Sequence, residues 1–80
     1  MTYITFGEDH AHVVNNITFD KNCVAAIPSN NRTEGRHKAF DLFNIKWCFE
    51  YFDREFKRED LKYFPRGIIN VENGDNIDLS

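Results

Sequence analysis

The sequence is poor in cysteine, which limits its redox chemistry. Only Cys23 and Cys48 occur in 80 residues, so the chain lacks the dense disulfide framework of small secreted domains. Both lie in apolar segments that alternate as strands do, where a free cysteine packs as a small hydrophobic residue. Neither lies at a predicted helix start, which would lower the pKa of a catalytic thiol. We therefore expect two core cysteines rather than a nucleophile served by His10, His12 or His37.

Long hydrophobic runs are also absent. No apolar stretch approaches the roughly 18 to 20 residues needed to cross a membrane, and the opening Met-Thr-Tyr-Ile is not a signal peptide. A composition of 41% hydrophobic and 29% charged residues is typical of a soluble globular domain. These features predict a cytoplasmic protein with no membrane contact.

No single sign of charge dominates the chain, whose net charge is −3. The excess of acidic residues lies at the two ends, within residues 1–31 and 72–80. No basic face stands out, although such a face is the usual mark of a protein that binds nucleic acid directly. We therefore expect no direct nucleic-acid binding.

The motifs of common enzymes are missing. The chain has no phosphate-binding loop, nucleophile elbow or dinucleotide fingerprint. Its main group of carboxylates alternates with basic residues, as on a solvated helix, and comprises Glu50, Asp53, Glu55, Glu59 and Asp60. Paired carboxylates perform acid–base chemistry only in a pocket that shifts their pKa values. We expect no enzyme activity and no cofactor.

What the chain does have is an amphipathic segment followed by an aromatic one, over residues 31–52. Asn31-x-x-Glu34 resembles a capping box, and Asn44 suits the end of the helix. From residue 45 the period changes to two, so that one strand face carries Ile45, Trp47, Phe49 and Tyr51 and the other carries Lys46, Cys48 and Glu50. The core joining this helix to this strand is expected to comprise Phe40, Phe43, Trp47 and Phe49.

The remaining segments predict an α+β fold. Strands are expected at Thr2–Phe6, His10–Val14, Ile17–Phe19, Cys23–Ile27 and Gly67–Glu72, with a hairpin turn at Asn15-Asn16. A short second helix runs from about Arg54 or Lys57 to Tyr63, before Pro65. We expect a single domain over residues 1–72, with a mostly antiparallel sheet of four or five strands and the main helix on one face. Residues 73–80 read as an acidic, mobile tail.

His10 and His12 carry the main alternative function. On a strand, alternate residues project from the same face with Cα atoms about 7 Å apart, so two imidazoles could share a metal ion. Zinc sites usually have a second close pair of ligands, which this sequence lacks. A small metal-binding regulatory domain therefore remains the second hypothesis, and we expect no bound metal.

Aromatic residues are abundant, with eight Phe, three Tyr and one Trp. A core of this size cannot hide them all, and tyrosine and tryptophan near arginine are typical of protein interfaces. The acidic N-terminal part could add electrostatic attraction to a basic partner. The expected partner-binding residues are Trp47, Tyr51, Phe52, Tyr63, Glu8, Asp9 and Asp20.

Two stretches carry a resemblance to a known group of proteins. Phe6–Ile27 and Tyr63–Ile69 look like short phage- and prophage-encoded accessory proteins, a group that includes anti-CRISPR and other anti-defence inhibitors. The resemblance implies a non-enzymatic protein that acts in the host cytoplasm by binding a larger host protein, such as a nucleic-acid-processing complex. It implies no residue roles, and it leaves a homodimer open.

Overall fold

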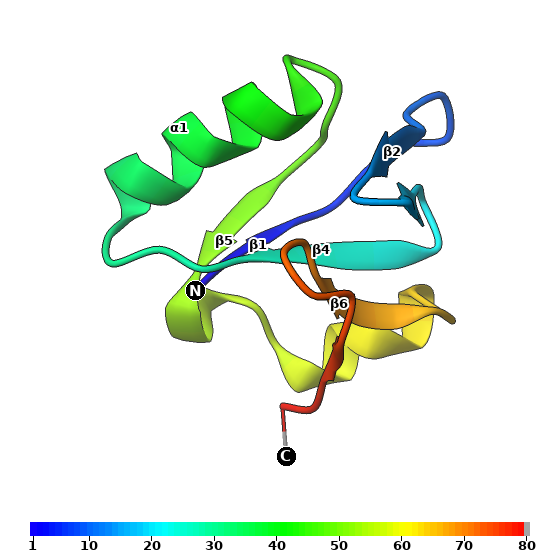
Figure 1. Cartoon of the computed structure of the whole chain (residues 1–80). Coiled ribbons are helices and arrows are strands. Elements are labelled where there is room, and N and C mark those ends of the chain that lie inside the picture. The colour runs from blue at the N-terminus through cyan, green and yellow to red at the C-terminus, as the bar shows by residue number, and fades with distance from the viewer. Residues whose placement is uncertain (80) are drawn as a thin grey trace.

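Strands, one α-helix and two 3-10 helices follow one another in the computed structural model, which describes residues 1–79 (Figure 1). The strands are β1 (Thr2–Ile4), β2 (His12–Val14), β3 (Ile17–Phe19), β4 (Cys23–Ile27), β5 (Glu50–Phe52), β6 (Gly67–Asn70) and β7 (Asn76–Ile77). The helices are α1 (Arg32–Phe43), η1 (Asp53–Glu55) and η2 (Arg58–Tyr63). The α+β class predicted from the sequence is confirmed.

Five strands form one mixed sheet in the order β5-β1-β4-β6-β7. Neighbouring strands are antiparallel except β4 and β6, which run parallel with Val24 opposite Ile68. The expected mostly antiparallel sheet is therefore correct only in part. Alternation of side chains reports which face a residue occupies, and it says nothing about the direction of the neighbouring strand. All five residues of β4 are buried, as is typical of a central strand covered on both faces.

The predicted hairpin forms between β2 and β3. Its turn residues Asn15 and Asn16 have φ values of 52° and 65°, and a type I′ turn requires positive φ at both positions. The hairpin does not join the main sheet but makes a separate two-stranded sheet. It lies across one face of the molecule, where the ring of Phe19 packs 5.7 Å from that of Phe43 in α1.

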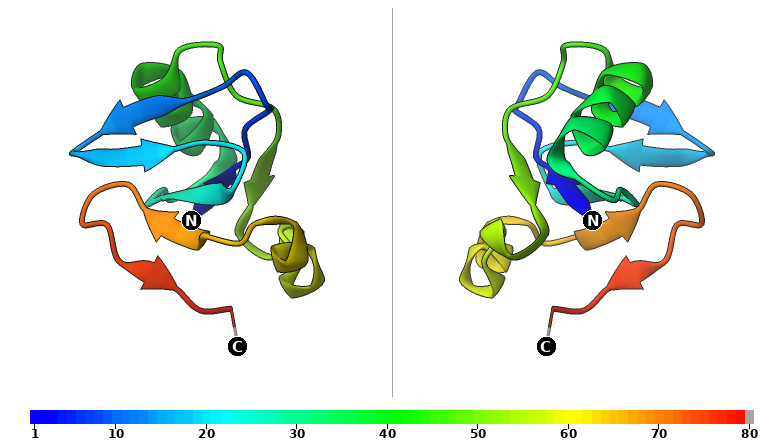
Figure 2. Two further views of the ribbon diagram at one scale, coloured as in Figure 1. Left: turned by 90° about the vertical axis from the view of Figure 1, so that its right-hand side faces the viewer. Right: turned by 90° about the vertical axis from the view of Figure 1, so that its left-hand side faces the viewer.

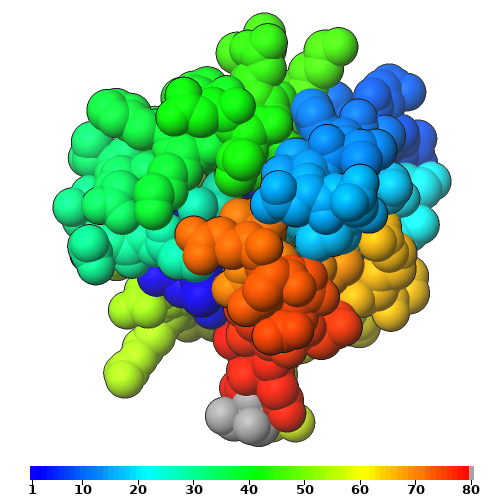
Figure 3. All heavy atoms as spheres, in the orientation of Figure 1, coloured from blue at the N-terminus to red at the C-terminus, as the bar shows by residue number. Residues whose placement is uncertain are grey.

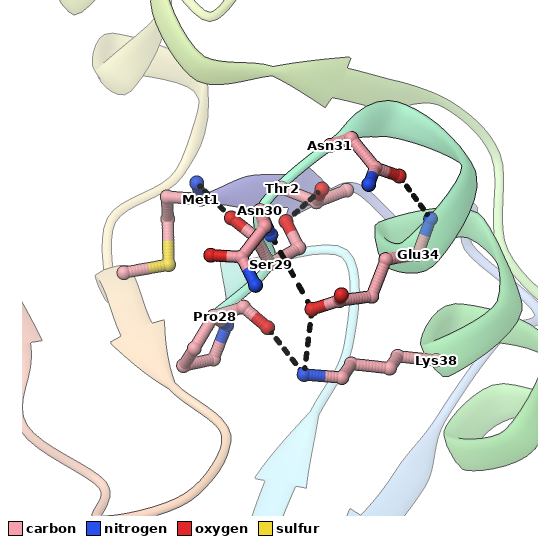
Figure 4. Close-up of polar contacts among 8 residues, drawn as sticks. All are labelled: Met1, Thr2, Pro28, Ser29, Asn30, Asn31, Glu34 and Lys38. Atoms are coloured by element: carbon pink, nitrogen blue, oxygen red, sulfur yellow. Dashed lines mark hydrogen bonds and ion pairs between the residues drawn. The ribbon is translucent and has the colours of Figure 1, made fainter.

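The ends of α1 lie where the sequence predicts them. The Asn31 side chain accepts a hydrogen bond of 2.8 Å from the Glu34 N–H, and Glu34 accepts one of 3.3 Å from the Asn30 N–H (Figure 4). Lys38 then binds both the Glu34 carboxylate and the Pro28 carbonyl. At the other end Asn44 has a φ of 57°, and its N–H binds the Phe40 carbonyl at 2.9 Å.

The main sheet separates two groups of buried side chains. Between the sheet and the layer formed by α1 and the hairpin lies the first group, built around Ile4, Phe19 and Phe43. On the opposite face Tyr3 and Phe56 are central to the second group, which the segment 53–63 covers. Figure 2 shows these two layers on either side of the sheet, and Figure 3 shows α1, the hairpin and the segment after β6 meeting on the visible surface of the molecule.

The aromatic core expected between helix and strand is only partly correct. Phe43 is 1% exposed, whereas Trp47 is half-buried, Phe40 is 44% exposed and Phe49 is 63% exposed. The prediction is therefore wrong for Phe40 and Phe49. Phe40 lies on the outer side of α1, where its ring packs against that of Trp47 at a centroid distance of 5.4 Å instead of entering the core.

The two cysteines also differ from each other in burial. Cys23 is fully buried in β4, as expected, while Cys48 is exposed. Burial raises the pKa of the Cys23 thiol, which makes it less nucleophilic. The prediction of two core cysteines is therefore wrong for Cys48, for a reason that lies in the backbone just before β5.

The segment after β5 forms two 3-10 helices, and the second, η2, matches the predicted short helix that starts near Lys57 and ends at Tyr63. Asp53 has a φ of 56° and Phe56 is extended, so the chain forms η1, turns, and then forms η2. The interruption directs Phe56 into the second core, where it is 5% exposed. No helix within residues 1–79 is long and apolar enough to cross a membrane.

Residues 73–79 are the described part of the expected acidic tail, and they include the strand β7. This strand pairs with β6, placing Ile77 opposite Ile68. Ile77 and Leu79 both pack against the second core. The described part of this segment thus adds a strand to the main sheet, while the domain boundary at residue 72 stays a prediction. Ser80 lies outside the described residues.

Candidate protein-binding site

A β-bulge immediately before β5 controls which side chains reach the surface. The pairing of Tyr3 with Tyr51 continues to Thr5, whose N–H binds the Phe49 carbonyl at 3.0 Å. The Thr5 carbonyl, however, accepts a hydrogen bond of 2.8 Å from the Cys48 N–H. Two residues of one strand thus oppose a single residue of the other, which inserts an extra residue and shifts the alternation by one.

The bulge places Cys48 and Phe49 along one pocket, although strict alternation would have separated them. Trp47, on the other side of the bulge, packs against the helix-side core, and its indole N–H binds the Asn44 carbonyl at 3.0 Å. Tyr51 packs against the second core. The sequence-based expectation that Trp47 and Tyr51 share a face is therefore wrong, and the bulge is the reason.

The pocket lies between β5 and η2 and has a volume of about 340 Å³. We call it the aromatic pocket; it is lined by Thr5, Phe6, Cys48, Phe49, Tyr51, Phe56, Asp60, Tyr63 and Phe64. Its rings contact one another in sequence. Tyr51 packs edge-on against Phe56 with centroids 5.5 Å apart, and Phe56 lies 6.2 Å from Phe64. Rings held by such contacts form a preorganised surface, which lowers the entropy lost on binding.

Two aromatic side chains at this pocket are unusually exposed. Phe49 is 63% and Tyr63 is 64% exposed. Complete burial of a phenylalanine side chain stabilises by roughly 1.5 to 3 kcal/mol relative to leaving it in water. Most of the Phe49 side chain stays in water in this fold, so a partner that covered the pocket would bury it and stabilise the complex. Exposed apolar surface of this kind is typical of interaction sites.

One carboxylate lies among the rings. Asp60, near the middle of η2, is half-buried and lines the aromatic pocket. Its backbone N–H binds the Lys57 carbonyl at 3.0 Å, which fixes the turn that presents the side chain.

The acidic loop after β1 adjoins the Cys48 end of the pocket. Gly7 lies so close to this cysteine that a Cβ atom on Gly7 would be 3.0 Å from the Cys48 Sγ. Glu8 and Asp9 follow Gly7 directly and are exposed. Glu8 forms a loose ion pair with Lys21, with 3.8 Å between Oε1 and Nζ.

The structure brings together four of the seven residues expected to bind a partner. Tyr51 and Tyr63 line the aromatic pocket, and Glu8 and Asp9 lie on the adjoining loop. The other three residues lie elsewhere. Trp47 is on the helix side, Phe52 lies under the Arg32 guanidinium at 6.0 Å, and Asp20 pairs with Arg66 at 3.4 Å.

Sequence reasoning missed several pocket residues, and the sequence offers only a weak signal for them. Phe56 and Phe64 read as anchors of a short helix, Cys48 and Phe49 as core, and Asp60 as one member of a solvated charge run. The available signal was a segment rich in aromatic residues, followed directly by a segment of mixed charge. The break between η1 and η2 and the bulge, which together form the pocket, depend on tertiary contacts that local patterns do not encode.

Ion pairs occupy the free edge of β5. Arg36 binds Glu50 through its Nε at 2.6 Å, and Arg32 binds Glu55. Glu55 also accepts a hydrogen bond of 2.9 Å from the Phe52 N–H. This N–H lies on β5, and its engagement leaves fewer free groups for another strand to pair with. The edge is thus protected, and the exposed aromatic surface is the better candidate for binding.

The two histidines considered for metal binding are held by backbone groups. His10 Nδ1 accepts a hydrogen bond of 3.2 Å from the Gly7 N–H, and His12 Nε2 lies 2.8 Å from the Lys46 carbonyl oxygen. His10 precedes β2 rather than lying on it, so the alternation that placed both imidazoles on one face does not apply. No three histidine, cysteine or acidic side chains within the described part of the chain converge as metal ligands.

Comparison of the chain with protein-family models, with curated proteins and with solved structures finds no significant match. The functional argument therefore depends on the geometry of the site.

Proposed function

We propose that this chain is a small, non-enzymatic protein-binding module that docks a partner protein at the aromatic pocket. The single observation that supports this most is the exposure of Phe49 and Tyr63 on the walls of a preorganised pocket. Central aromatic anchors commonly account for most of the affinity of an interface. Neighbouring Glu8 and Asp9 would add attraction to a partner with basic character.

The class of partner that we propose is a larger protein of a nucleic-acid-processing complex, which the chain inhibits by occupying its surface. The support for this is the acidic balance of the chain, the two acidic residues beside the aromatic pocket and the resemblance to phage-encoded anti-defence proteins. Proteins that hold DNA or RNA carry basic grooves, and an acidic protein is attracted to such a groove. The cytoplasm of a host cell is the compartment that fits this role.

The test compares three variants of the tagged chain in co-purification from host cells. Tyr63→Ala and Phe49→Ala truncate exposed rings of the pocket, whereas Ile45→Ala truncates a side chain that is 75% exposed outside it. A partner that is retained by Ile45→Ala but lost by the two pocket variants would support the proposal. A partner that binds all three equally would place the interface elsewhere.

Inhibition is tested with the purified partner. The wild-type chain is added to the partner's nucleic-acid binding or cleavage reaction beside Tyr63→Ala at equal concentration. We expect inhibition by the wild type and a loss of about tenfold or more in potency for Tyr63→Ala, as for other central aromatic anchors. Binding without inhibition would retain the docking function and remove the inhibitory one. The structure adds no support for the metal-binding alternative, because His10 and His12 are each engaged with a backbone group.

A further inference from the structure

The rings of the aromatic pocket create an electrostatic preference. The faces of aromatic rings carry negative potential and attract cations that come within about 6 Å of the centroid. Rings line most of the pocket, and they come from the chain after β1, from β5 and the residue before it, and from the segment that follows β5. One of these rings already attracts a cation, because the Lys62 ammonium lies 5.2 Å from the centroid of Tyr63.

Asp60 adds a negative charge to the pocket, and no side chain of the described residues pairs with it. Five other carboxylates form ion pairs within residues 1–79, namely Glu8, Asp20, Glu34, Glu50 and Glu55. No side-chain hydrogen bond or ion pair to Asp60 is formed by the described residues, although it is half-buried among rings. The Asp60 carboxylate therefore has no counter-charge among the described residues, and a cation entering the pocket would supply one.

We infer, building on the docking function proposed above, that the aromatic pocket receives an arginine side chain of the partner protein. Its guanidinium would stack on the ring of Phe49, over which no cation of the described residues lies, and would bind the Asp60 carboxylate. Arginine fits better than lysine because the guanidinium is planar, weakly hydrated and able to bind a carboxylate through two N–H groups. A volume of about 340 Å³ leaves room for the whole side chain.

The surroundings of the pocket favour the same ligand. The loop carrying Glu8 and Asp9 adjoins its Cys48 end, so a basic segment that places one arginine in the pocket would meet further negative charge there. The chain as a whole carries a net charge of −3. Complementary charge of this kind increases the rate of association and disfavours acidic partners.

The probe is the capped tripeptide acetyl-Gly-Arg-Gly-amide, titrated into the ¹⁵N-labelled full chain and followed by the shifts of backbone amide resonances. We expect saturable shifts at Phe49, Asp60 and Tyr63 with a Kd of about 1 to 10 mM, as suits a single side chain. The matched ligand carries citrulline, which keeps the size and planarity of arginine without its charge. We expect citrulline to bind at least about fivefold more weakly, because one desolvated charge contact is removed.

A pair of protein variants identifies the carboxylate. Asp60→Asn keeps the shape of the side chain and removes its charge, and we expect about fivefold weaker binding of the arginine peptide with no change for citrulline. Glu59→Gln is the control, because Glu59 is the adjacent carboxylate of η2 and does not line the aromatic pocket. We expect its affinity for arginine to equal that of the wild type.

The outcomes separate this inference from the proposed function. Absence of shifts at the pocket with the arginine peptide, equal affinity for arginine and citrulline, or equal affinity of Asp60→Asn and wild type would each overturn the arginine inference. Docking would still stand in those cases if Tyr63→Ala abolished binding of the partner protein. If Tyr63→Ala bound the partner as the wild type does, the docking proposal itself would fail.

Discussion

Thr2 of β1 occupies the space that a side chain at Gly35 of α1 would need. A Cβ atom added to Gly35 would overlap the Thr2 Oγ1 and lie 2.6 Å from the Thr2 Cβ. The Thr2 hydroxyl also shares a hydrogen bond of 2.7 Å with the Ser29 hydroxyl, which holds it in place beside the helix (Figure 4). The glycine therefore allows the first turns of α1 to pack directly against the Thr2 side chain of β1.

Gly35→Ala should consequently destabilise the fold. Alanine improves helix propensity by roughly 1 kcal/mol over glycine, but the clash with Thr2 requires α1 to move, and overpacking typically costs about 1 to 3 kcal/mol. We expect a net loss in the free energy of unfolding, measured by urea denaturation. Thr33→Ala changes an exposed position of the same helix and should not destabilise by this route. A higher unfolding midpoint for Gly35→Ala would contradict the packing described here.

Phe43 and Phe40 should differ sharply although they lie one turn apart on α1. Phe43 is fully buried and packs edge-on against Phe6 with centroids 4.9 Å apart, so Phe43→Ala should cost about 3 to 5 kcal/mol. That is close to the whole stability of a small domain. Phe40→Ala should cost much less, because Phe40 is 44% exposed. Thermal melting of both variants checks the contrast, and equal effects would show that the helix is turned differently.

The pH dependence of stability should reflect Glu55. Hydrogen bonds from the Arg32 guanidinium and the Phe52 N–H lower the pKa of this carboxyl below its ordinary value of about 4.3. A group whose pKa is lower in the folded state stabilises the fold above its unfolded pKa, and this contribution is lost as the pH falls through the folded pKa. We therefore expect Glu55→Gln to show a shallower loss of stability than the wild type below about pH 4.3, where the unfolded glutamate is half protonated.

The control for this measurement is Glu59→Gln. Glu59 lies on the surface of η2 and has no ion pair among the described residues, so its removal should leave the acid limb of the stability curve unchanged. Acid titrations of unfolding by circular dichroism provide the comparison. Identical acid limbs for Glu55→Gln and the wild type would mean that the contacts of Glu55 do not contribute to folding.

Stability should also depend on the segment that the sequence suggested was a mobile tail. Ile77 pairs with Ile68 and packs against the second core while half-buried. Ile77→Ala is therefore expected to destabilise by about 1 to 2 kcal/mol, less than a fully buried isoleucine. Asp75→Ala, at an exposed position nearby, should have little effect. Indistinguishable unfolding of Ile77→Ala and the wild type would favour the original domain boundary at residue 72.

Local patterns were sufficient for features of the fold that depend on local chemistry. The hairpin turn follows from the positive φ that Asn15 and Asn16 adopt easily, and the cap at Asn31 follows from its side-chain oxygen, which accepts from the Glu34 N–H. The end of α1 at Asn44 lies where the sequence predicts it, although a ψ of −130° takes this residue outside the left-handed helical conformation expected there. The continuously buried strand β4 was also evident, because Cys23–Ile27 contains no polar residue. These elements agree with the sequence because the information that specifies them lies within a few residues.

Features that depend on distant contacts were not accessible in this way. The bulge at Cys48 and Phe49 exists because both pair with Thr5, more than forty residues earlier in the chain. The bulge moves Cys48 to the face opposite the expected one. It also places Trp47 and Tyr51 on opposite faces, although the alternation predicted that they share one. The parallel pairing of β4 with β6 and the positive φ of Asp53 likewise arise from tertiary structure. The candidate site lies where these non-local features meet, so its aromatic composition was predictable and its geometry was not.

The kinetics of partner binding should divide the site into two parts. The exposed rings of Phe49 and Tyr63 would be covered in the complex, so Tyr63→Ala should mainly accelerate dissociation, with an affinity loss of about 2 kcal/mol or more. Glu8 and Asp9 lie at the margin of the pocket and remain in water. The double variant Glu8→Gln/Asp9→Asn should therefore mainly slow association, since charges at the rim act through steering.

Salt separates the two contributions further. Charges in water are screened over about 10 Å at 0.1 M ionic strength, so raising salt from about 50 to 500 mM should slow association of the wild type and leave its dissociation rate nearly constant. The Glu8→Gln/Asp9→Asn variant should show a weaker salt dependence, because part of the attracting charge is already gone. Surface plasmon resonance with the immobilised partner measures both rates. If salt and this variant leave association unchanged while Tyr63→Ala still accelerates dissociation, the acidic loop takes no part in binding and the pocket acts alone.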